Sequence, residues 1–266
     1  MKKATLILVL VSTLTLVLVT VAPAGEVMDR ILKKGELVVG ITGNQPPLNA
    51  KTKSGKIIGF DADLAELIAA NMGVKIKFAS MPFAELLPAI EKGKVDMIIS
   101  GMTMMPQRNL KVAFVGPYFV SGKGILTKAQ HIAALQAADG LDKPDFKVAA
   151  LKGSTSQLFV ERTAPRAKLL TTANYDEAID MLLQNKIDAV VADYPFCGFS
   201  AFRYRDKGLM AGKSKLTFEP LGIAVPEDTL LLNLGQNYLI LLEGSGALKA
   251  VGERWFNDAS WIKELP

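Results

Sequence analysis

The chain has 266 residues, of which 50% are hydrophobic and 21% are charged, and its formal net charge at pH 7 is +5. Its positive residues are interspersed with acidic ones and form no basic run with interleaved aromatic residues, so we expect no nucleic-acid partner. The chain has one histidine, His131, and one cysteine, Cys197. We therefore predict no disulfide framework, no histidine-ligated metal site, no Ser-His-Asp triad and no cofactor.

The first 24 residues have the organisation of a secretory signal peptide. Lys2 and Lys3 precede an apolar run over residues 4–21, and Ala22-Pro23-Ala24 presents small residues for cleavage. An uncleaved membrane anchor is the alternative, because the run approaches the roughly 20 residues that span a bilayer. Ser12, Thr13, Thr15 and Thr20 interrupt the run and favour cleavage after Ala24 and a periplasmic location. The mature chain would keep about 242 residues, enough for two lobes with substantial cores.

Beyond residue 24, short apolar segments alternate with amphipathic ones, which predicts an α/β fold with mostly parallel sheets. In the first half we expect strands at 37–41, 74–78 and 95–100, and helices at 60–72 and 83–92. In the second half we expect strands at 147–151, 167–170 and 187–192, and helices at 156–163 and 175–184. Further helices are expected near residues 230–242 and 246–256.

The two halves repeat the same plan. Residues 85–96 can be superposed on residues 177–188, each segment reading as a helix, a cap, a charged turn and a buried strand. This repeat predicts two lobes, one of residues 25–121 and 219–266 and the other of residues 122–218, with crossings within 115–128 and 218–225. In the superposition Gly101 falls on Asp193, just past each strand, where open α/β sheets bind ligands. Asp193 is therefore a candidate pocket carboxylate, although it could be a solvated turn residue.

The segment from Ser100 to Arg108 combines a flexible turn, the Thr103 hydroxyl and an arginine that follows Pro106 at a plausible helix start. A guanidinium binds a carboxylate in bidentate fashion. An isolated arginine is usually a surface residue, and it is the whole segment that suggests a binding role for Arg108.

Two further segments carry candidate site residues. Residues 153–157 follow a strand and open a helix, so free backbone N–H groups there favour an anion. Ser154 and Gln157 also have capping-box spacing, which could by itself explain the hydroxyl. Residues 42–48, including Asn44 and Gln45, are expected to line the first-lobe side together with Phe83, which could equally be ordinary core.

At these residues the chain resembles the periplasmic solute-binding proteins for polar amino acids, the receptors of ABC importers. The resemblance covers essentially the whole mature chain and includes residues 59–64, 100–108, 117–119 and 153–156. It implies a two-lobed periplasmic binding protein fold (type II) and a monomer that captures an α-amino acid between its lobes. It also implies delivery of that amino acid to an ABC permease at the inner membrane.

The resemblance also implies roles for the candidate residues. The ligand α-carboxylate would be bound from both lobes, and the α-ammonium would be bound by Asp193 with a backbone carbonyl of Ser100 or Gly101. Phe83 would stack on the ligand side chain. The carboxylate-binding groups would be Arg108, Thr103, Ser154 and Thr155.

Three positions depart from the usual pattern of this family. An aromatic residue is usual at Gln45, an aspartate is common at Thr42 in receptors for cationic or amide side chains, and a second threonine is usual at Met105. The missing aspartate argues weakly against lysine, arginine or glutamine, and the sequence does not name the amino acid.

Two other functions remain open at this stage. Some relatives on this fold resemble cyclohexadienyl or arogenate dehydratases, which would need a carboxylic acid aimed at the leaving hydroxyl, for which Glu161 and Glu219 are candidates. A ligand-sensing receptor with a separate signalling partner is the other alternative.

Overall fold

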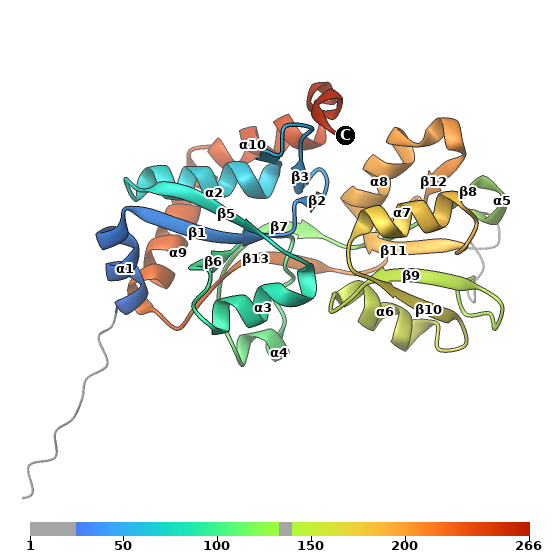
Figure 1. The fold of residues 1–266 in the computed structure, drawn as a ribbon, viewed down its shortest axis with the longest axis horizontal. Coiled ribbons are helices and arrows are strands. Elements are labelled where there is room, and N and C mark those ends of the chain that lie inside the picture. Colours follow the sequence, from blue (N-terminus) through green and yellow to red (C-terminus); the bar gives the residue numbers. More distant parts are fainter. Residues whose placement is uncertain (1–24, 133–139) are drawn as a thin grey trace, which may run out of the picture.

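The computed structural model describes residues 25–132 and 140–266, so the predicted signal peptide lies outside the described residues. The described chain forms two lobes, each built on a five-stranded sheet flanked by helices (Figure 1). The first sheet has the order β5 (Lys75–Ser80), β1 (Glu36–Ile41), β6 (Met97–Ile98), β13 (Glu219–Val225), β7 (Ala113–Ser121). The second has the order β10 (Lys168–Thr172), β9 (Lys147–Leu151), β11 (Ala189–Asp193), β8 (Lys123–Lys128), β12 (Leu209–Ala211).

Both sheets are mixed, whereas the sequence predicted mostly parallel ones. Strands β5, β1 and β6 run parallel, as do β10, β9 and β11. The remaining strands pair antiparallel, β13 with β6 and β7 and β8 with β11 and β12. Three of these antiparallel strands, β7, β8 and β13, flank the points where the chain passes between the lobes.

Helices cover the sheets on the sides expected from their apolar faces. The first lobe and the returning carboxyl-terminal segment contain α1 (Glu26–Lys34), α2 (Phe60–Asn71), α3 (Phe83–Glu91), α4 (Pro106–Asn109), α9 (Thr229–Gly244), α10 (Ala247–Phe256) and η3 (Ser260–Glu264). The second lobe contains α5 (Ala129–Ile132), α6 (Thr155–Thr163), α7 (Tyr175–Leu183), α8 (Tyr194–Arg203) and η2 (Arg205–Lys207). The sequence analysis did not predict α1, α8 or the small sheet of β2 (Asn44–Gln45), β3 (Asn49–Lys51) and β4 (Ile57–Ile58).

The chain crosses between the sheets twice. It leaves the first sheet at the end of β7, enters the second at the start of β8, and returns from β12 into β13. Most of the residues that were expected to form flexible crossings belong to the paired strands β7, β8 and β13. The irregular segments that connect the two sheets are therefore short. The first crossing is a single residue, Gly122, between two strands. Gly122 lies against Thr217 of the second crossing, so close that a Cβ added at Gly122 would collide with the Thr217 carbonyl oxygen. The two crossings are therefore packed together.

The internal repeat is visible in the hydrogen bonds of Asp96 and Asp188. The Asp96 N–H donates to the Val38 carbonyl while its carboxylate accepts from the Val38 N–H, both at 2.8 Å. Asp188 makes the same pair of bonds with Lys147, at 2.9 and 2.8 Å. In each lobe this aspartate therefore joins the start of the third parallel strand, β6 or β11, to the first, β1 or β9.

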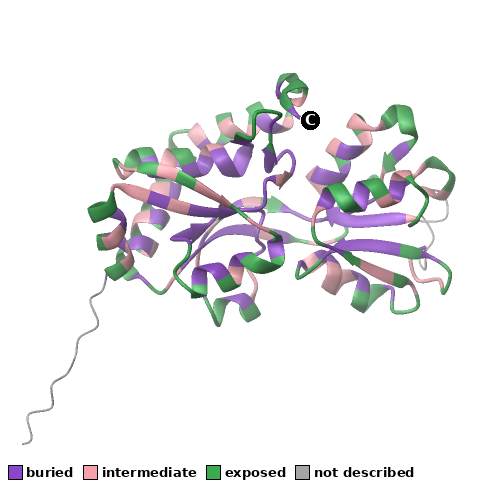
Figure 2. Cartoon of the chain, in the orientation of Figure 1, coloured by how far each residue is buried: buried purple, intermediate pink, exposed green. Residues whose placement is uncertain are grey.

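Burial follows the two sheets. The inner strands of each lobe are buried while the outer helix faces are exposed (Figure 2). Cys197 is fully buried on α8, where burial raises the pKa of its thiol well above the ordinary value, as expected of a small core residue. Among the described residues, none of the helices is both long and apolar enough to cross a bilayer.

Candidate functional site

Arg108 lies at the junction of the two lobes. It is on the short helix α4, which Pro106 begins, and it is only 6% exposed. Its guanidinium donates from Nη1 to the Thr103 carbonyl at 2.9 Å and from Nη2 to the Gly153 carbonyl of the second lobe at 3.3 Å. The guanidinium also lies 5.4 Å from the centre of the Phe83 ring. Arg108 is therefore held between the turn of one lobe and the turn of the other.

Burial lowers the pKa of Arg108 to about 10, and nearby carboxylates of Glu219 and Asp193 oppose this effect. The side chain stays protonated at neutral pH. A guanidinium has five N–H donors, and protein carbonyls take two of them in the described contacts, so Arg108 retains donors for a bidentate anion.

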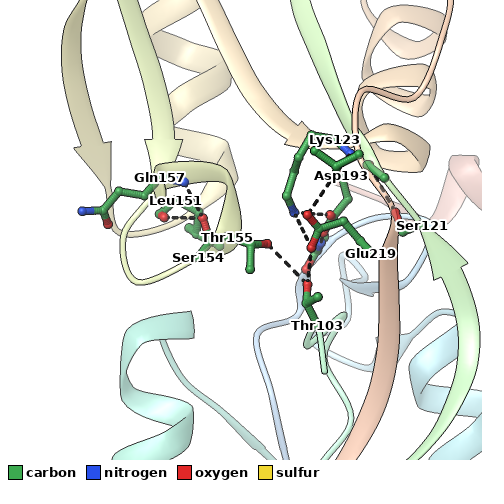
Figure 3. Close-up of polar contacts among 12 residues, drawn as sticks. Thr103, Ser121, Lys123, Leu151, Ser154, Thr155, Gln157, Asp193 and Glu219 are labelled. Carbon is green, nitrogen blue, oxygen red and sulfur yellow. Dashed lines mark hydrogen bonds and ion pairs between the residues drawn. The ribbon is translucent and has the colours of Figure 1, made fainter. Parts of the chain in front are cut away.

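Thr103 and Thr155 meet across the lobes with their hydroxyl oxygens 3.3 Å apart. The Thr103 hydroxyl also donates to Glu219 at 2.7 Å, and the Thr217 hydroxyl donates to the other oxygen of the same carboxylate at 3.0 Å. Figure 3 shows these contacts as a continuous chain from Thr155 through Thr103 to Glu219 and then to Lys123.

Asp193 ends β11 and is 4% exposed. Its Oδ1 accepts from Lys123 Nζ at 2.7 Å, and its Oδ2 accepts from Gln45 Nε2 of the first lobe at 2.5 Å. Lys123 is directly opposite Asp193 in the antiparallel register of β8 and β11, and its Nζ is also 3.7 Å from Glu219. Thus the Asp193 carboxylate is paired within its own lobe and hydrogen bonded to the other.

The amino terminus of α6 faces the same junction. Ser154 is its N-cap and accepts from the Gln157 N–H at 3.2 Å, while the Gln157 side chain accepts from the Gly153 N–H at 2.9 Å. The capping explanation for Ser154 is therefore correct as far as its hydroxyl is concerned. The other first-turn N–H groups, at Thr155 and Ser156, belong to the set that a helix cannot satisfy internally, and they suit an anion.

A buried network supports the first-lobe side. The Ser100 hydroxyl accepts from the Thr42 N–H at 3.0 Å, and the Gly101 N–H donates to the Tyr118 hydroxyl at 3.2 Å. Tyr118 in turn donates to Asp61 at 2.8 Å. Burial, the largest cause, raises the pKa of Asp61 to about 7, although hydrogen bonds from Asn49 and Tyr118 lower it. These contacts fix the turn that carries Ser100 and Gly101.

The other predicted residues are less uniform in placement. Phe83, 7% exposed, packs in the core cluster, as one interpretation expected, and also presents its ring to Arg108. Gln45 reaches Asp193, but Asn44 lines a separate pocket with Asn174 and Arg203. Glu161 is exposed, whereas Glu219 is 7% exposed and lies within the junction.

The structure adds Lys123, Glu219 and Thr217 to the residues that sequence reasoning brought together. The sequence signal for Lys123 is that a lysine stands in an otherwise apolar strand. Its partner, Asp193, is known only from the register of β8 and β11. A cavity of about 290 Å³ reaches the junction and contacts Thr103, Thr155 and Glu219. The described residues contain no group of metal-ligating side chains. The junction therefore presents a buried guanidinium at Arg108 and a buried carboxylate at Asp193.

Known proteins support this interpretation. The chain is 31% identical over 247 residues to the ABC transporter glutamine-binding protein GlnH of Bacillus subtilis, covering 91% of this chain and 86% of that protein. It is 23% identical to cyclohexadienyl dehydratase of Pseudomonas aeruginosa, covering 86% and 85% of the two chains. A solved binding component of an ABC transporter from Wolinella succinogenes, complexed with lysine, is similar with a TM-score of 0.82 and 35% identity, covering 86% of this chain and 99% of that one.

Solved relatives, including the Wolinella succinogenes protein, confirm the predicted two-lobed α/β fold of the type II periplasmic binding proteins. The sequence profile of the bacterial extracellular solute-binding proteins, family 3, matches residues 37–258, which is most of the chain. The predicted resemblance is thereby confirmed, and the chain belongs to the family 3 bacterial extracellular solute-binding proteins.

Proposed function

We propose that this protein is a periplasmic receptor that captures an α-amino acid between its lobes and delivers it to an ABC permease. The observation that carries the proposal is the pair of buried, opposite charges at the junction, Arg108 on one lobe and Asp193 on the other. A zwitterion matches this pair, with its carboxylate on Arg108, Thr103 and the amino terminus of α6, and its ammonium on Asp193.

Contacts from both lobes give such a ligand a mechanical role. An amino acid completes its hydrogen bonds only when the lobes are closed, so it stabilises the closed state by differential affinity. In this proposal residues 25–121 with 219–266 form one lobe and residues 122–218 form the other. The mature receptor acts as a monomer without a cofactor, after signal-peptide cleavage behind Ala24.

A thermal-shift screen tests the proposal directly. The mature protein is unfolded and refolded to remove any bound ligand and is then mixed with each of the twenty amino acids, prephenate, arogenate and several dicarboxylates. A ligand at 100 times its dissociation constant should add about 2.7 kcal/mol of stability. A shift with one amino acid or a small set supports the receptor. No shift with any amino acid contradicts it.

A dehydratase-like enzyme is the second candidate because Glu219 is buried at the junction and one relative is named cyclohexadienyl dehydratase. The contacts of Glu219 disfavour it as a proton donor, since it accepts from two hydroxyls and faces the Lys123 ammonium. Such contacts suit a carboxylate. Turnover of prephenate or arogenate by the purified protein would establish the enzyme, and absence of turnover together with amino-acid binding favours the receptor.

A further inference from the structure

Lys123 is a buried cation in a site that is proposed to bind the ammonium group of an amino acid. It is 1% exposed and stands at the start of β8, immediately after the first crossing between the lobes. A buried ammonium is costly unless it is paired, and here it is paired with Asp193 at 2.7 Å and approaches Glu219 at 3.7 Å. Lys123 therefore already neutralises part of the negative charge that would attract a cationic ligand.

The buried charges at the junction are balanced before a ligand arrives. Arg108 and Lys123 supply two positive charges, and Asp193 and Glu219 supply two negative ones, all less than 10% exposed. A zwitterionic amino acid leaves this balance unchanged. An amino acid with a cationic side chain instead leaves one net positive charge in a closed site of low dielectric, where like charges repel strongly.

The Lys123 ammonium also has spare donor capacity. It carries three N–H groups and is in contact with one carboxylate at hydrogen-bond distance and a second somewhat farther away. Asp193 likewise has two oxygens with room for more than its two present donors. Lys123 can thus donate to a ligand oxygen while Asp193 accepts from the ligand ammonium.

We propose that Lys123 determines the side-chain specificity of this receptor: it rejects amino acids with cationic side chains and accepts those that end in a carboxamide or carboxylate oxygen. The inference rests on the proposed amino-acid receptor function and deepens it. The expected preference differs from that of the relative solved with lysine.

Two matched pairs of ligands isolate the charge. Citrulline has nearly the shape of arginine but ends in a neutral group with a carbonyl oxygen, and norleucine is a neutral analogue of lysine. By calorimetric titration we expect the wild-type protein to bind citrulline at least about tenfold more tightly than arginine, a difference of about 1.4 kcal/mol. We expect norleucine likewise to exceed lysine.

Lys123→Met removes the ammonium and leaves two carboxylates without it, so the ratio of arginine to citrulline affinity should rise at least about tenfold. If this variant fails to fold because its carboxylates are unpaired, Lys123→Met combined with Glu219→Gln restores equal numbers of buried charges. Because the charges of the double variant are again balanced, it should keep the part of the preference for citrulline that comes from charge and lose the part that comes from the Lys123 hydrogen bond, so the preference should fall without disappearing. Lys128→Met, on the same strand but only partly buried, is the matched control and should leave the ratio unchanged.

The outcomes separate the two proposals. Equal or tighter binding of arginine by the wild type, an unchanged ratio in the Lys123 variants, or binding restricted to glycine and alanine overturns the role of Lys123. Failure to bind any amino acid overturns the receptor function instead.

Discussion

At the scale of single residues, Arg108 is a buried side chain of a type that is usually exposed. It is desolvated, its charge is retained, and protein carbonyls use only part of its donor capacity. Arg108→Ala should therefore abolish binding of the amino acid found in the screen, at a cost on the order of 2–5 kcal/mol by calorimetric titration. Arg205→Ala is the control, because its side chain is 71% exposed. Retained affinity in Arg108→Ala would contradict the assignment of the carboxylate site.

A second prediction at the residue scale concerns the effect of Gly101→Ala on stability and ligand binding. It has φ +56°, and a Cβ there would lie 3.0 Å from Gln45 Oε1. Gly73 has φ +69° with open space around it, so Gly73→Ala carries the same backbone strain without the contact. Both substitutions should lower the free energy of unfolding by roughly 1–2 kcal/mol in urea. Only Gly101→Ala should also weaken ligand binding, because its methyl displaces the side chain that reaches Asp193; equal affinities would count against this.

Asp61 should make stability depend on pH. Because burial raises its pKa to about 7, the folded state holds this proton more tightly than the unfolded state does. The resulting stabilisation is complete below the ordinary pKa of 3.8 and is lost as pH rises through about 7. Urea denaturation between pH 4.5 and 8.5 should show the wild type losing stability relative to Asp61→Asn over this window.

The control for Asp61 is Asp145→Asn, whose side chain is fully exposed. Its stability should follow that of the wild type at every pH. A difference between the wild type and Asp61→Asn that stays constant with pH would show that Asp61 remains ionised when the protein is folded.

At the scale of elements, α6 and α7 share a capping mechanism but begin beside different parts of the first lobe. Ser154 and Asn174 each accept from the N–H three residues later, at 3.2 and 2.9 Å. Replacing either by alanine should cost about 1 kcal/mol of unfolding free energy. Only Ser154→Ala should also reduce ligand affinity, since α6 begins beside Thr103 whereas α7 does not. Equal ligand affinities in the two variants would remove α6 from the site.

The elements with strong periodicity were predictable from the sequence. Strand β9 has the predicted bounds, and α2, α3, α7 and α10 differ from their predictions by one residue at an end. The strand predicted at 95–100 was placed correctly, but its ladder pairing is confined to Met97–Ile98. Helix α8 was not predicted, although Pro195 lies in its first turn, where proline is compatible with the start of a helix.

The candidate site was only partly predictable for a physical reason. Arg108, Thr103, Asp193 and the α6 turn belong to local motifs, and each lies at the end of an element. Lys123 becomes part of the site through an antiparallel register between strands 70 residues apart, and no local pattern encodes that pairing. Gln45 was expected on one wall of the pocket, but its hydrogen bond to the other lobe depends on how the lobes close.

At the scale of the whole molecule, three hydrogen bonds join the lobes across the site, in addition to the contacts of Glu219 with Lys123 and Thr217 at the crossings. The three bonds link Gln45 to Asp193, Thr103 to Thr155, and Arg108 to Gly153. All three use groups proposed to bind the ligand. The energy of ligand binding and the energy of closure therefore depend on the same side chains, and a test of closure must act at a contact that the ligand does not touch.

Ala84 offers such a contact. It is exposed on α3, and a Cβ added at Gly153 would lie 3.3 Å from the Ala84 Cβ, so the two backbones meet across the lobes. Ala84→Trp should hold the lobes apart and weaken ligand binding at least about tenfold, although every proposed ligand contact is kept. Small-angle X-ray scattering with ligand added should give a larger radius of gyration than for the wild type. Ala70→Trp, on the exposed end of α2, is the matched control for adding an indole and should change neither quantity. Wild-type affinity and compactness in Ala84→Trp would show that the ligand does not need the lobes to close at this point.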